Sequence, residues 1–173
     1  MKVAIISDVH NNEVNLAKVL DFCKKEEIKT IVCCGDLASR ETLDFMNDNF
    51  FGNILYTFGN ADYDDLRELA KEKKYRQTYL FENFGEAVIE KRSVAFVHFP
   101  DIAKNLARTG KYDFIFYGHT HKPWIAEGKA DQGGKKYTIL NPGTTAGEIY
   151  PPTFAVWEAE DDNFQLIRVH DLK

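Results

Sequence analysis

The sequence predicts an α/β protein that folds as one domain of two packed β-sheets flanked by helices. In the first half, short apolar runs alternate with amphipathic segments, an order typical of a mostly parallel sheet with helices outside it. In the second half, apolar runs follow one another with turn residues between them. The length of 173 residues fits a single domain, residues 1–173, that buries a core without disulfide or metal staples.

Three apolar runs in the first half are expected to be strands, at residues 2–6, 30–34 and 53–58. Three amphipathic segments are expected to be helices, at residues 12–27, 39–48 and 62–73. Each helix begins at a good N-cap side chain, namely Asn12, Ser39 and Asp62. The buried face of the first helix is predicted from five residues at helical spacing, Val14, Leu16, Val19, Leu20 and Cys23.

The second half of the chain is predicted to consist mainly of strands separated by turns. The expected strands are residues 86–92, 93–99, 113–118, 123–128, 135–140, 153–159 and 163–170. Turn residues at 131–134 (DQGG) and 141–145 (NPGTT) separate the later strands. One helix is expected at 101–110, with Asp101 as its N-cap after Pro100.

Composition and charge argue against several kinds of partner. The net charge is −5 and the basic residues are scattered, with the densest run at 71–76, so no nucleic-acid groove is expected. No apolar stretch approaches the roughly 20 residues of a membrane helix, and the N-terminus lacks a signal-peptide cleavage site. The cysteines Cys23, Cys33 and Cys34 do not form a disulfide framework, so a reducing, cytoplasmic location is expected.

Polar residues with metal-binding side chains follow five of the expected strands. They are Asp8, His10, Asp36, Asn60, His98, His119 and His121. In an open α/β sheet, sites form outside the carboxyl ends of the strands, so these turns are expected to converge on one edge. Four of the five histidines belong to this set and only His170 lies elsewhere, which favours a metal site.

Two Asp, one Asn and four His are too many ligands for one tetrahedral ion. They fit two ions that share a bridging carboxylate, and their N and O donors suit Mn, Fe, Zn, Co or Ni. His119 and His121 are expected to reach two neighbouring ions, with Gly118 allowing a sharp turn of the backbone.

Taken singly, these motifs have structural explanations. An Asp at a strand end, such as Asp8, is often a helix cap, and Gly35-Asp36 and Gly59-Asn60 are common turn sequences. His98, after an apolar strand, fits a core histidine with satisfied hydrogen bonds. The joint order of the motifs at successive strand ends favours the metal site over these alternatives.

In chain order, the motifs D-x-H, G-D, G-N, a lone His after a strand and G-H-x-H resemble those of the calcineurin-like metallophosphoesterases. The chain length and the NPGT stretch at 141–144 resemble the small prokaryotic phosphodiesterase branch of that family. The resemblance implies a four-layer α/β/β/α sandwich of two mixed sheets flanked by helices. It also implies a dinuclear-metal-dependent phosphohydrolase, above all a phosphodiesterase, with a small phosphate ester as substrate.

The resemblance assigns four ligands to each metal, with one shared: Asp8, His10, Asp36 and His121, and Asp36, Asn60, His98 and His119. The bridging Asp36, together with Asn60 and His98, is expected to take part in catalysis. A hydroxide bridging the two ions would attack phosphorus in line with the leaving group. Manganese is the favoured ion, with Ni, Co, Fe or Zn as alternatives.

Two positions depart from the family pattern. Many members have a histidine after the Asn of G-N that protonates the leaving group, but this chain has Ala61. Esters whose leaving groups depart as stable anions are therefore expected as substrates, with aryl or nucleoside esters, and diesters generally, favoured over alkyl monoesters. Asp62 could serve as the acid, although a helix cap is its favoured role. His98 is followed by Phe99 where Gly is common, so Phe99 and Pro100 are expected to narrow the site.

Other function classes remain open from the sequence. The main alternative is a non-catalytic protein-interaction scaffold, because the small subunit of the retromer cargo complex uses this fold mainly for interactions. All seven ligand residues are present here, which favours catalysis. Seven ligands without a closed Cys/His cage disfavour a structural metal site. Metallo-β-lactamase-like hydrolases carry H-x-H early in the chain, whereas here it is late. A homo-oligomer is compatible with the sequence.

Overall fold

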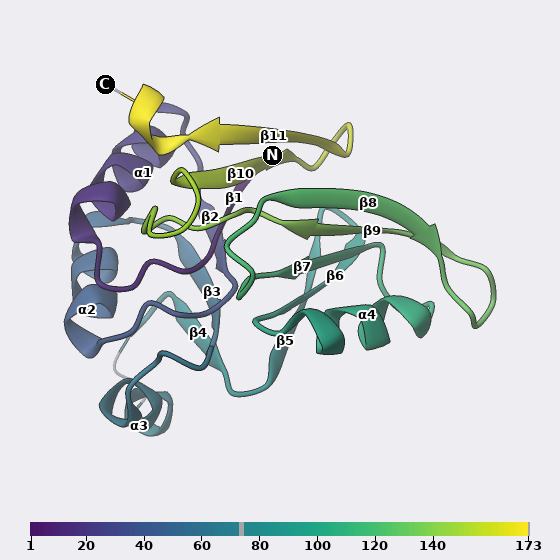
Figure 1. The fold of residues 1–173 in the computed structure, drawn as a ribbon, viewed down its shortest axis with the longest axis horizontal. Helices are drawn as coiled ribbons and strands as arrows, with labels where there is room; N and C mark the ends of the chain where they lie inside the picture. The colour runs from purple at the N-terminus through teal and green to yellow at the C-terminus, as the bar shows by residue number, and fades with distance from the viewer. Residues whose placement is uncertain (73–74, 173) are drawn as a thin grey trace.

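The computed structural model describes residues 1–72 and 75–172. Its layers are a group of helices, a six-stranded sheet, a five-stranded sheet and a further helix (Figure 1). Helices α1 (Glu13–Lys25) and α2 (Arg40–Asn49) lie at the left of the figure, and α4 (Pro100–Arg108) lies below the second sheet. The predicted α/β/β/α sandwich of two mixed sheets is therefore confirmed.

The first sheet has the strand order β11-β10-β1-β2-β3-β4. Its strands are β1 (Lys2–Ile6), β2 (Thr30–Cys33), β3 (Asn53–Thr57), β4 (Thr78–Phe81), β10 (Thr153–Glu158) and β11 (Asn163–Arg168). Strands β1 to β4 pair in parallel, whereas β10 is antiparallel to both β1 and β11. Helices α1, α2 and α3 (Asp64–Glu72) connect the parallel strands, so the carboxyl ends of β1, β2 and β3 meet at one edge.

The second sheet has the strand order β5-β6-β7-β9-β8. Its strands are β5 (Phe84–Ile89), β6 (Arg92–Val97), β7 (Phe114–Tyr117), β8 (Trp124–Lys129) and β9 (Lys136–Asn141). Strands β6, β7 and β9 are parallel, and β5 and β8 form antiparallel edges. A short 3₁₀ helix, Val169–Asp171, follows β11.

Three apolar cores lie between the four layers. In β1, Ala4 and Ile6 belong to the core beneath α1 and α2, whereas Val3 and Ile5 belong to the core between the sheets. This division follows from the alternation of side chains along a strand. The intersheet core also contains Trp157, and a third core lies between the second sheet and α4. Central strands such as β1, β2 and β7 are thus buried on both faces, which explains their continuous apolar runs.

The strand predictions were wrong in three places, one of which is the end of the last strand: Val169 and His170, predicted as strand, belong to the 3₁₀ helix Val169–Asp171. Strand β4 (Thr78–Phe81) was not predicted, because this four-residue run has partly exposed side chains and pairs only with β3. The expected boundary between residues 92 and 93 was also misplaced. The chain turns at Glu90 and Lys91, which have φ angles of 46° and 66°, the left-handed conformation of a two-residue hairpin turn.

The helix predictions need two corrections on their buried faces and caps. Val14 is 72% exposed, whereas Asn15 is buried and donates its side-chain amide to the carbonyls of Thr145 and Ala146. Two residues correspond to 200° of helical rotation, so Val14 faces away from the buried stripe that begins at Leu16. In α4, Phe99 is the N-cap without a side-chain bond, and the predicted cap Asp101 lies inside the first turn.

Cysteines Cys23, Cys33 and Cys34 are free and buried. Among the described residues, no helix has the length and apolar character needed to cross a bilayer. Of the basic run at 71–76, residues 73 and 74 lie outside the described part of the chain, as does the predicted end of the third helix at residue 73.

Candidate metal centre

The seven predicted ligands all lie in loops that follow β1, β2, β3, β6 and β7, as the sequence predicts. Their loops meet where the carboxyl ends of the two sheets converge, so residues more than 100 positions apart in the chain come into contact. Asp8, Asp36, His98 and His121 are buried. His10 is partly buried, whereas Asn60 and His119 are exposed.

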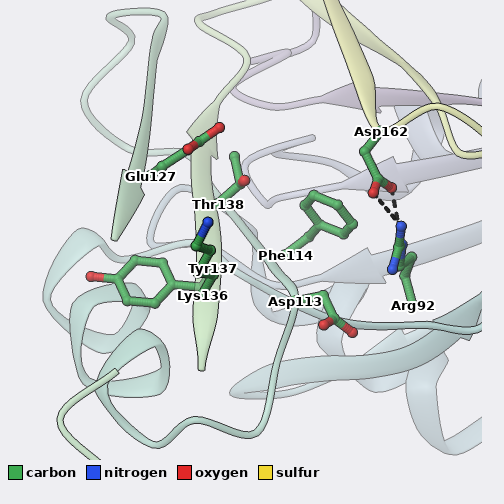
Figure 2. A pocket seen from close by; sticks show the side chains of 8 residues that line it. All are labelled: Arg92, Asp113, Phe114, Glu127, Lys136, Tyr137, Thr138 and Asp162. Atoms are coloured by element: carbon green, nitrogen blue, oxygen red, sulfur yellow. Dashed lines mark hydrogen bonds and ion pairs between the residues drawn. The ribbon is translucent and has the colours of Figure 1, made fainter. Parts of the chain in front are cut away.

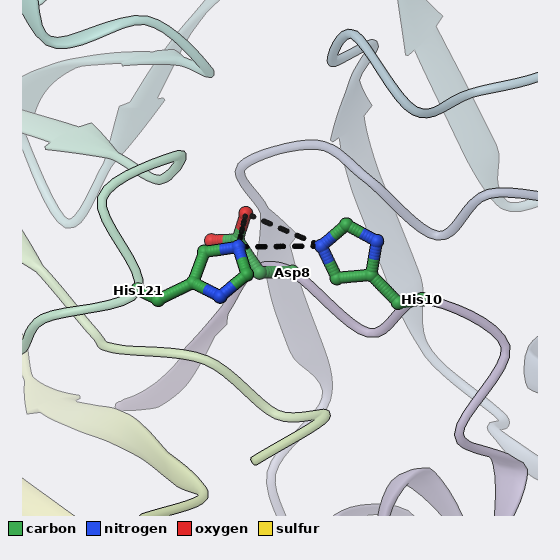
Figure 3. A group of neighbouring side chains, drawn as sticks. All are labelled: Asp8, His10 and His121. Carbon is green, nitrogen blue, oxygen red and sulfur yellow. Dashed lines mark hydrogen bonds and ion pairs between the residues drawn. The ribbon is translucent and has the colours of Figure 1, made fainter. Parts of the chain in front are cut away.

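The first cluster consists of Asp8, His10 and His121 (Figure 3). The Nε2 atoms of His10 and His121 face each other at 3.3 Å. Asp8 Oδ1 lies 3.3 Å from His121 Nε2 and 3.8 Å from His10 Nε2. Figure 3 shows the carboxylate and both rings pointing toward one small volume.

The second cluster is centred on His98. Its Nε2 atom lies 3.2 Å from Asp36 Oδ2, 3.0 Å from Asn60 Oδ1 and 3.2 Å from His119 Nδ1. Asp8, Asp36 and His98 also form a closely spaced group. Asn60 and His119 join this cluster through their contacts with His98, and the backbone N–H of His119 donates to the Asp8 carboxylate at 3.1 Å.

Asp36 lies between the two clusters. Its Oδ2 atom is 3.2 Å from His98 Nε2 and 3.8 Å from His10 Nε2. Its other oxygen, Oδ1, accepts a hydrogen bond of 2.8 Å from the backbone N–H of Ala61. One carboxylate oxygen thus faces both clusters, the position that a bridging ligand requires.

The donor set fits a pair of divalent cations. In each of two imidazole pairs, His10–His121 and His98–His119, two ring nitrogens face each other, and a cation between them would satisfy both lone pairs. Imidazole and carboxylate donors without thiolate suit Mn, Fe, Zn, Co or Ni.

The electrostatic field of the centre favours positive charge. The nearby Asp8 carboxylate raises the pKa of His10. Burial lowers the pKa of His98, but the neighbouring Asp36 carboxylate outweighs burial and the net pKa is raised. Burial likewise raises the pKa of Asp8, but the neighbouring imidazoles of His10 and His121 outweigh it and hold the pKa well below its usual range. A bound cation would replace the protons that these rings would otherwise take up.

Five of the seven ligand residues have backbone φ angles in the left-handed region. They are Asp8 (54°), His10 (46°), Asp36 (58°), His119 (69°) and His121 (59°). This conformation costs about 1–2 kcal/mol for a residue with a Cβ atom. Such strain concentrates at functional sites, where the surrounding structure holds it in place.

Two glycines of the motifs are required by space rather than by φ. A Cβ atom on Gly118 would lie 1.9 Å from Ser7 Oγ and 3.0 Å from Asp8 Oδ2. The φ of Gly118 is not positive, so glycine is needed at this position for the close approach and not for a left-handed conformation. A Cβ atom on Gly59 would lie 2.1 Å from Asp36 Oδ1. Both glycines therefore allow a carboxylate of the centre to approach the backbone.

The loop at 141–146, of which residues 141–145 were predicted as a turn, supports the centre. The Asn141 amide donates to the carbonyl of Gly118 at 2.9 Å. The Thr144 hydroxyl donates to the carbonyl of Asp8 at 3.0 Å, and the N–H of Ala146 donates to the same carbonyl at 2.9 Å. This loop thus ties the Asp8 loop to the His119 loop, and the NPGTT sequence is the signal that marks it.

Asp62 does not have its favoured predicted role as the cap of α3. It is buried, and its Oδ2 atom accepts hydrogen bonds from the N–H groups of Gly59 at 2.6 Å and Asp36 at 3.2 Å. Its Oδ1 atom accepts from the N–H of Ala38 at 2.9 Å. Both oxygens therefore bind backbone donors outside α3, so Asp62 does not cap this helix.

A cavity of about 340 Å³ lies away from these residues (Figure 2). It lies beside the amino ends of β6, β7 and β9, whereas the seven ligands follow carboxyl ends. Arg92 forms an ion pair with Asp162 on one side of this cavity, with Arg92 Nε 3.0 Å from Asp162 Oδ1. None of the seven ligands lines it, so it is not the candidate metal centre.

Comparisons with known proteins agree with the geometry. A family model described as the calcineurin-like phosphoesterase superfamily domain matches residues 1–162. A phosphodiesterase of Methanocaldococcus jannaschii is 27% identical over 171 residues, which cover 96% of this chain and 98% of that protein. A solved archaeal phosphodiesterase has a TM-score of 0.83 at 25% identity, covering 97% of this chain and 99% of its own. A phosphoesterase from E. coli shares the fold, with a TM-score of 0.67 at 16% identity and coverage of 98% and 100%.

Proposed function

The chain belongs to the calcineurin-like phosphoesterase superfamily, and we propose that it is a metal-dependent phosphodiesterase acting on small phosphate diesters. The observation that carries this proposal is the convergence of two carboxylates and four imidazoles, with ring nitrogens facing each other at 3.2 and 3.3 Å. The similarity to an archaeal phosphodiesterase along almost the whole chain supports the choice of diesters.

We propose that two divalent ions, preferably manganese, bind here, the first to Asp8, His10, Asp36 and His121, and the second to Asp36, Asn60, His98 and His119. When bound, two such ions supply hydroxide for in-line attack on phosphorus and neutralise the charge of the phosphoryl oxygens. The chain itself has a net charge of −5, so the ions also account for the binding of an anionic substrate.

The protein orients its ligands through bonds on their far sides. His98 Nδ1 lies 2.8 Å from the carbonyl oxygen of Cys34. If Nδ1 carries the ring proton and donates it to this carbonyl, the lone pair of Nε2 is available to bind a cation. The N–H of Ala61 fixes one oxygen of Asp36 and leaves the other directed at both clusters. Together with Asn60 Oδ1, which lies 3.0 Å from His98 Nε2, these contacts support our proposal that Asp36, Asn60 and His98 take part in catalysis.

The chemistry of the leaving group restricts the substrate class. Ala61 has no titratable side chain, and the Asp62 carboxylate is bound by three backbone N–H groups. A leaving group that departs as a stable anion needs little protonation. A nucleoside leaves as a sugar alkoxide, which does need protonation, so nucleoside esters do not share this advantage. We therefore propose aryl diesters as substrates rather than alkyl monoesters.

Phe99 is expected to contribute to substrate binding. Its ring lies 5.0 Å from the His98 ring and 5.2 Å from the His119 ring, and its side chain is 37% exposed. An aromatic group of the substrate can pack on it. Phe99→Ala should raise KM for bis(4-nitrophenyl) phosphate by about 3–10-fold, as loss of an aromatic contact of about 1 kcal/mol predicts. Steady-state kinetics on the manganese-loaded protein would measure this change.

The control for Phe99 is Phe51→Ala, because Phe51 is 77% exposed and precedes β3 at its amino end. This control should leave KM unchanged. A second diester, methyl 4-nitrophenyl phosphate, has the same leaving group but a small methyl group in place of the second aromatic ring. Comparing the two diesters therefore separates an effect on binding of the ring from an effect on the chemical step. If Phe99→Ala left KM for both diesters unaltered, an aromatic contact with substrate would be ruled out.

Removal and return of metal tests the proposed function directly. Treatment with a chelator should reduce hydrolysis of bis(4-nitrophenyl) phosphate by at least about 100-fold, because the ions generate the nucleophile near neutral pH. Addition of Mn²⁺ should restore it, with about two ions bound per chain by elemental analysis. Absence of turnover with each of Mn, Ni, Co, Zn and Fe would instead favour the interaction scaffold.

We also propose a cytoplasmic location. The three cysteines are buried as free thiols, which is typical of proteins kept in a reducing compartment.

A further inference from the structure

We propose that Asp62 is a positioning residue that aligns the loops carrying Asp36 and Asn60 for metal binding, an inference that builds on the proposed function. The carboxylate does not belong to either closely spaced group of candidate ligands found among the described residues. Its side chain is buried, with 6% exposure, and it follows Asn60 by only two positions.

Asp62 connects two loops through the backbone. Its carboxylate accepts from the N–H groups of Asp36 and Ala38, which lie in the loop after β2. The same carboxylate accepts from the N–H of Gly59, which immediately precedes Asn60 in the loop after β3. One buried anion therefore fixes the backbone beside two predicted ligands.

A second bond runs in the opposite direction between the same loops. The N–H of Ala61 donates to Asp36 Oδ1 at 2.8 Å. Each loop thus supplies a carboxylate that is bound by the backbone of the other loop. Such reciprocal bonds define the separation of the loops as well as the direction of the Asp36 side chain.

The backbone held by Asp62 is strained. Asp36 has a φ of 58° and Ala38 a φ of 83°, and the N–H groups of both residues point at the Asp62 carboxylate. Neither residue adopts this conformation readily, because each has a Cβ atom. Without the carboxylate, the loop is expected to relax toward ordinary φ values and to move Asp36 away from its bridging position.

The test is the variant Asp62→Asn, which keeps the shape of the side chain but replaces one acceptor oxygen with an N–H₂ donor. The dissociation constant for Mn²⁺, measured by titration calorimetry, should rise by about 10–100-fold, the usual effect of losing a group that supports metal ligands. The electron paramagnetic resonance signal of a coupled manganese pair should weaken in parallel. Circular dichroism should show an unchanged secondary structure.

Two further variants make the outcome decisive. Asp64→Asn is the matched control, since Asp64 is exposed in the first turn of α3 and should leave manganese affinity unchanged. Asp62→Glu retains the carboxylate but displaces it, and should recover part of the lost affinity. If Asp62→Asn does not fold, an Asp62→Glu protein with wild-type affinity overturns the proposal, whereas a weaker affinity supports it.

The two proposals fail in different ways. A folded Asp62→Asn protein that binds Mn²⁺ as tightly as the wild type would overturn the positioning role of Asp62. This result would not affect the proposal that the protein is a phosphodiesterase. A wild-type protein that binds Mn²⁺ but hydrolyses no diester would overturn the proposed function, and the effect of Asp62 on metal affinity could still be measured.

Discussion

Asp36→Asn is expected to lower kcat/KM for bis(4-nitrophenyl) phosphate by at least about 1,000-fold, equivalent to about 4 kcal/mol of transition-state stabilisation. The reason is that Asp36 Oδ2 faces both clusters, at 3.2 Å from His98 Nε2 and 3.8 Å from His10 Nε2. An amide lacks the negative charge that a shared ligand of two cations needs. Kinetics with added Mn²⁺, together with measurement of bound metal, would test this prediction.

Two variants accompany this test. His98→Ala should cause a loss of similar size, because His98 contacts Asp36, Asn60 and His119. Asp48→Asn, which alters an exposed carboxylate of α2, should retain full activity. Full activity in both Asp36→Asn and His98→Ala would show that the ligand assignment is wrong.

Trp157→Ala is expected to have the largest effect on stability, lowering the free energy of unfolding by about 3–5 kcal/mol. Trp157 is fully buried between the two sheets. Trp157 lies on β10 of the first sheet. Its ring centroid lies 4.8 Å from that of Phe114 on β7 of the second sheet and 5.9 Å from that of Phe164 on the neighbouring strand β11. Urea unfolding followed by far-UV circular dichroism would measure the change without relying on tryptophan fluorescence.

The same experiment tests our proposal that residues 1–173 form a single domain. A residue between the sheets should destabilise both together, so one cooperative transition should move to lower urea. Trp124→Ala is the control, because Trp124 is 51% exposed on the edge strand β8 and should cost about 1 kcal/mol or less. Two separate transitions, with only one shifted, would contradict a single domain.

The predictable part of the fold was the part with strong local signals. Apolar runs that are buried on both faces, such as β1 (Lys2–Ile6), were identified nearly to the residue. The caps Asn12 and Ser39 were also correct, because their side chains accept from N–H groups three residues later. Strand β4 could not be predicted in this way, since its partly exposed residues become a strand only by pairing with β3.

Asp62 shows why a local pattern can mislead at a site. An Asp before an acidic helical segment has the sequence of an N-cap, and that pattern is independent of the rest of the chain. The folded protein instead places the loop after β2 within 3 Å of its carboxylate, because the parallel pairing of β2 and β3 brings the two loops together. The stronger charged hydrogen bonds at this contact decide the role of Asp62.

The sequence by itself determined which side chains are available for metal binding and that they follow strand ends, because alternation of apolar runs and helices is a local property. Only the tertiary structure decided how they meet. The two sheets pack face to face, and this brings Asp8 and His10 of one sheet within 4 Å of His121 of the other. The physical reason is that such contacts depend on the register and packing of distant strands, whereas the spacing of residues along the chain carries no record of either.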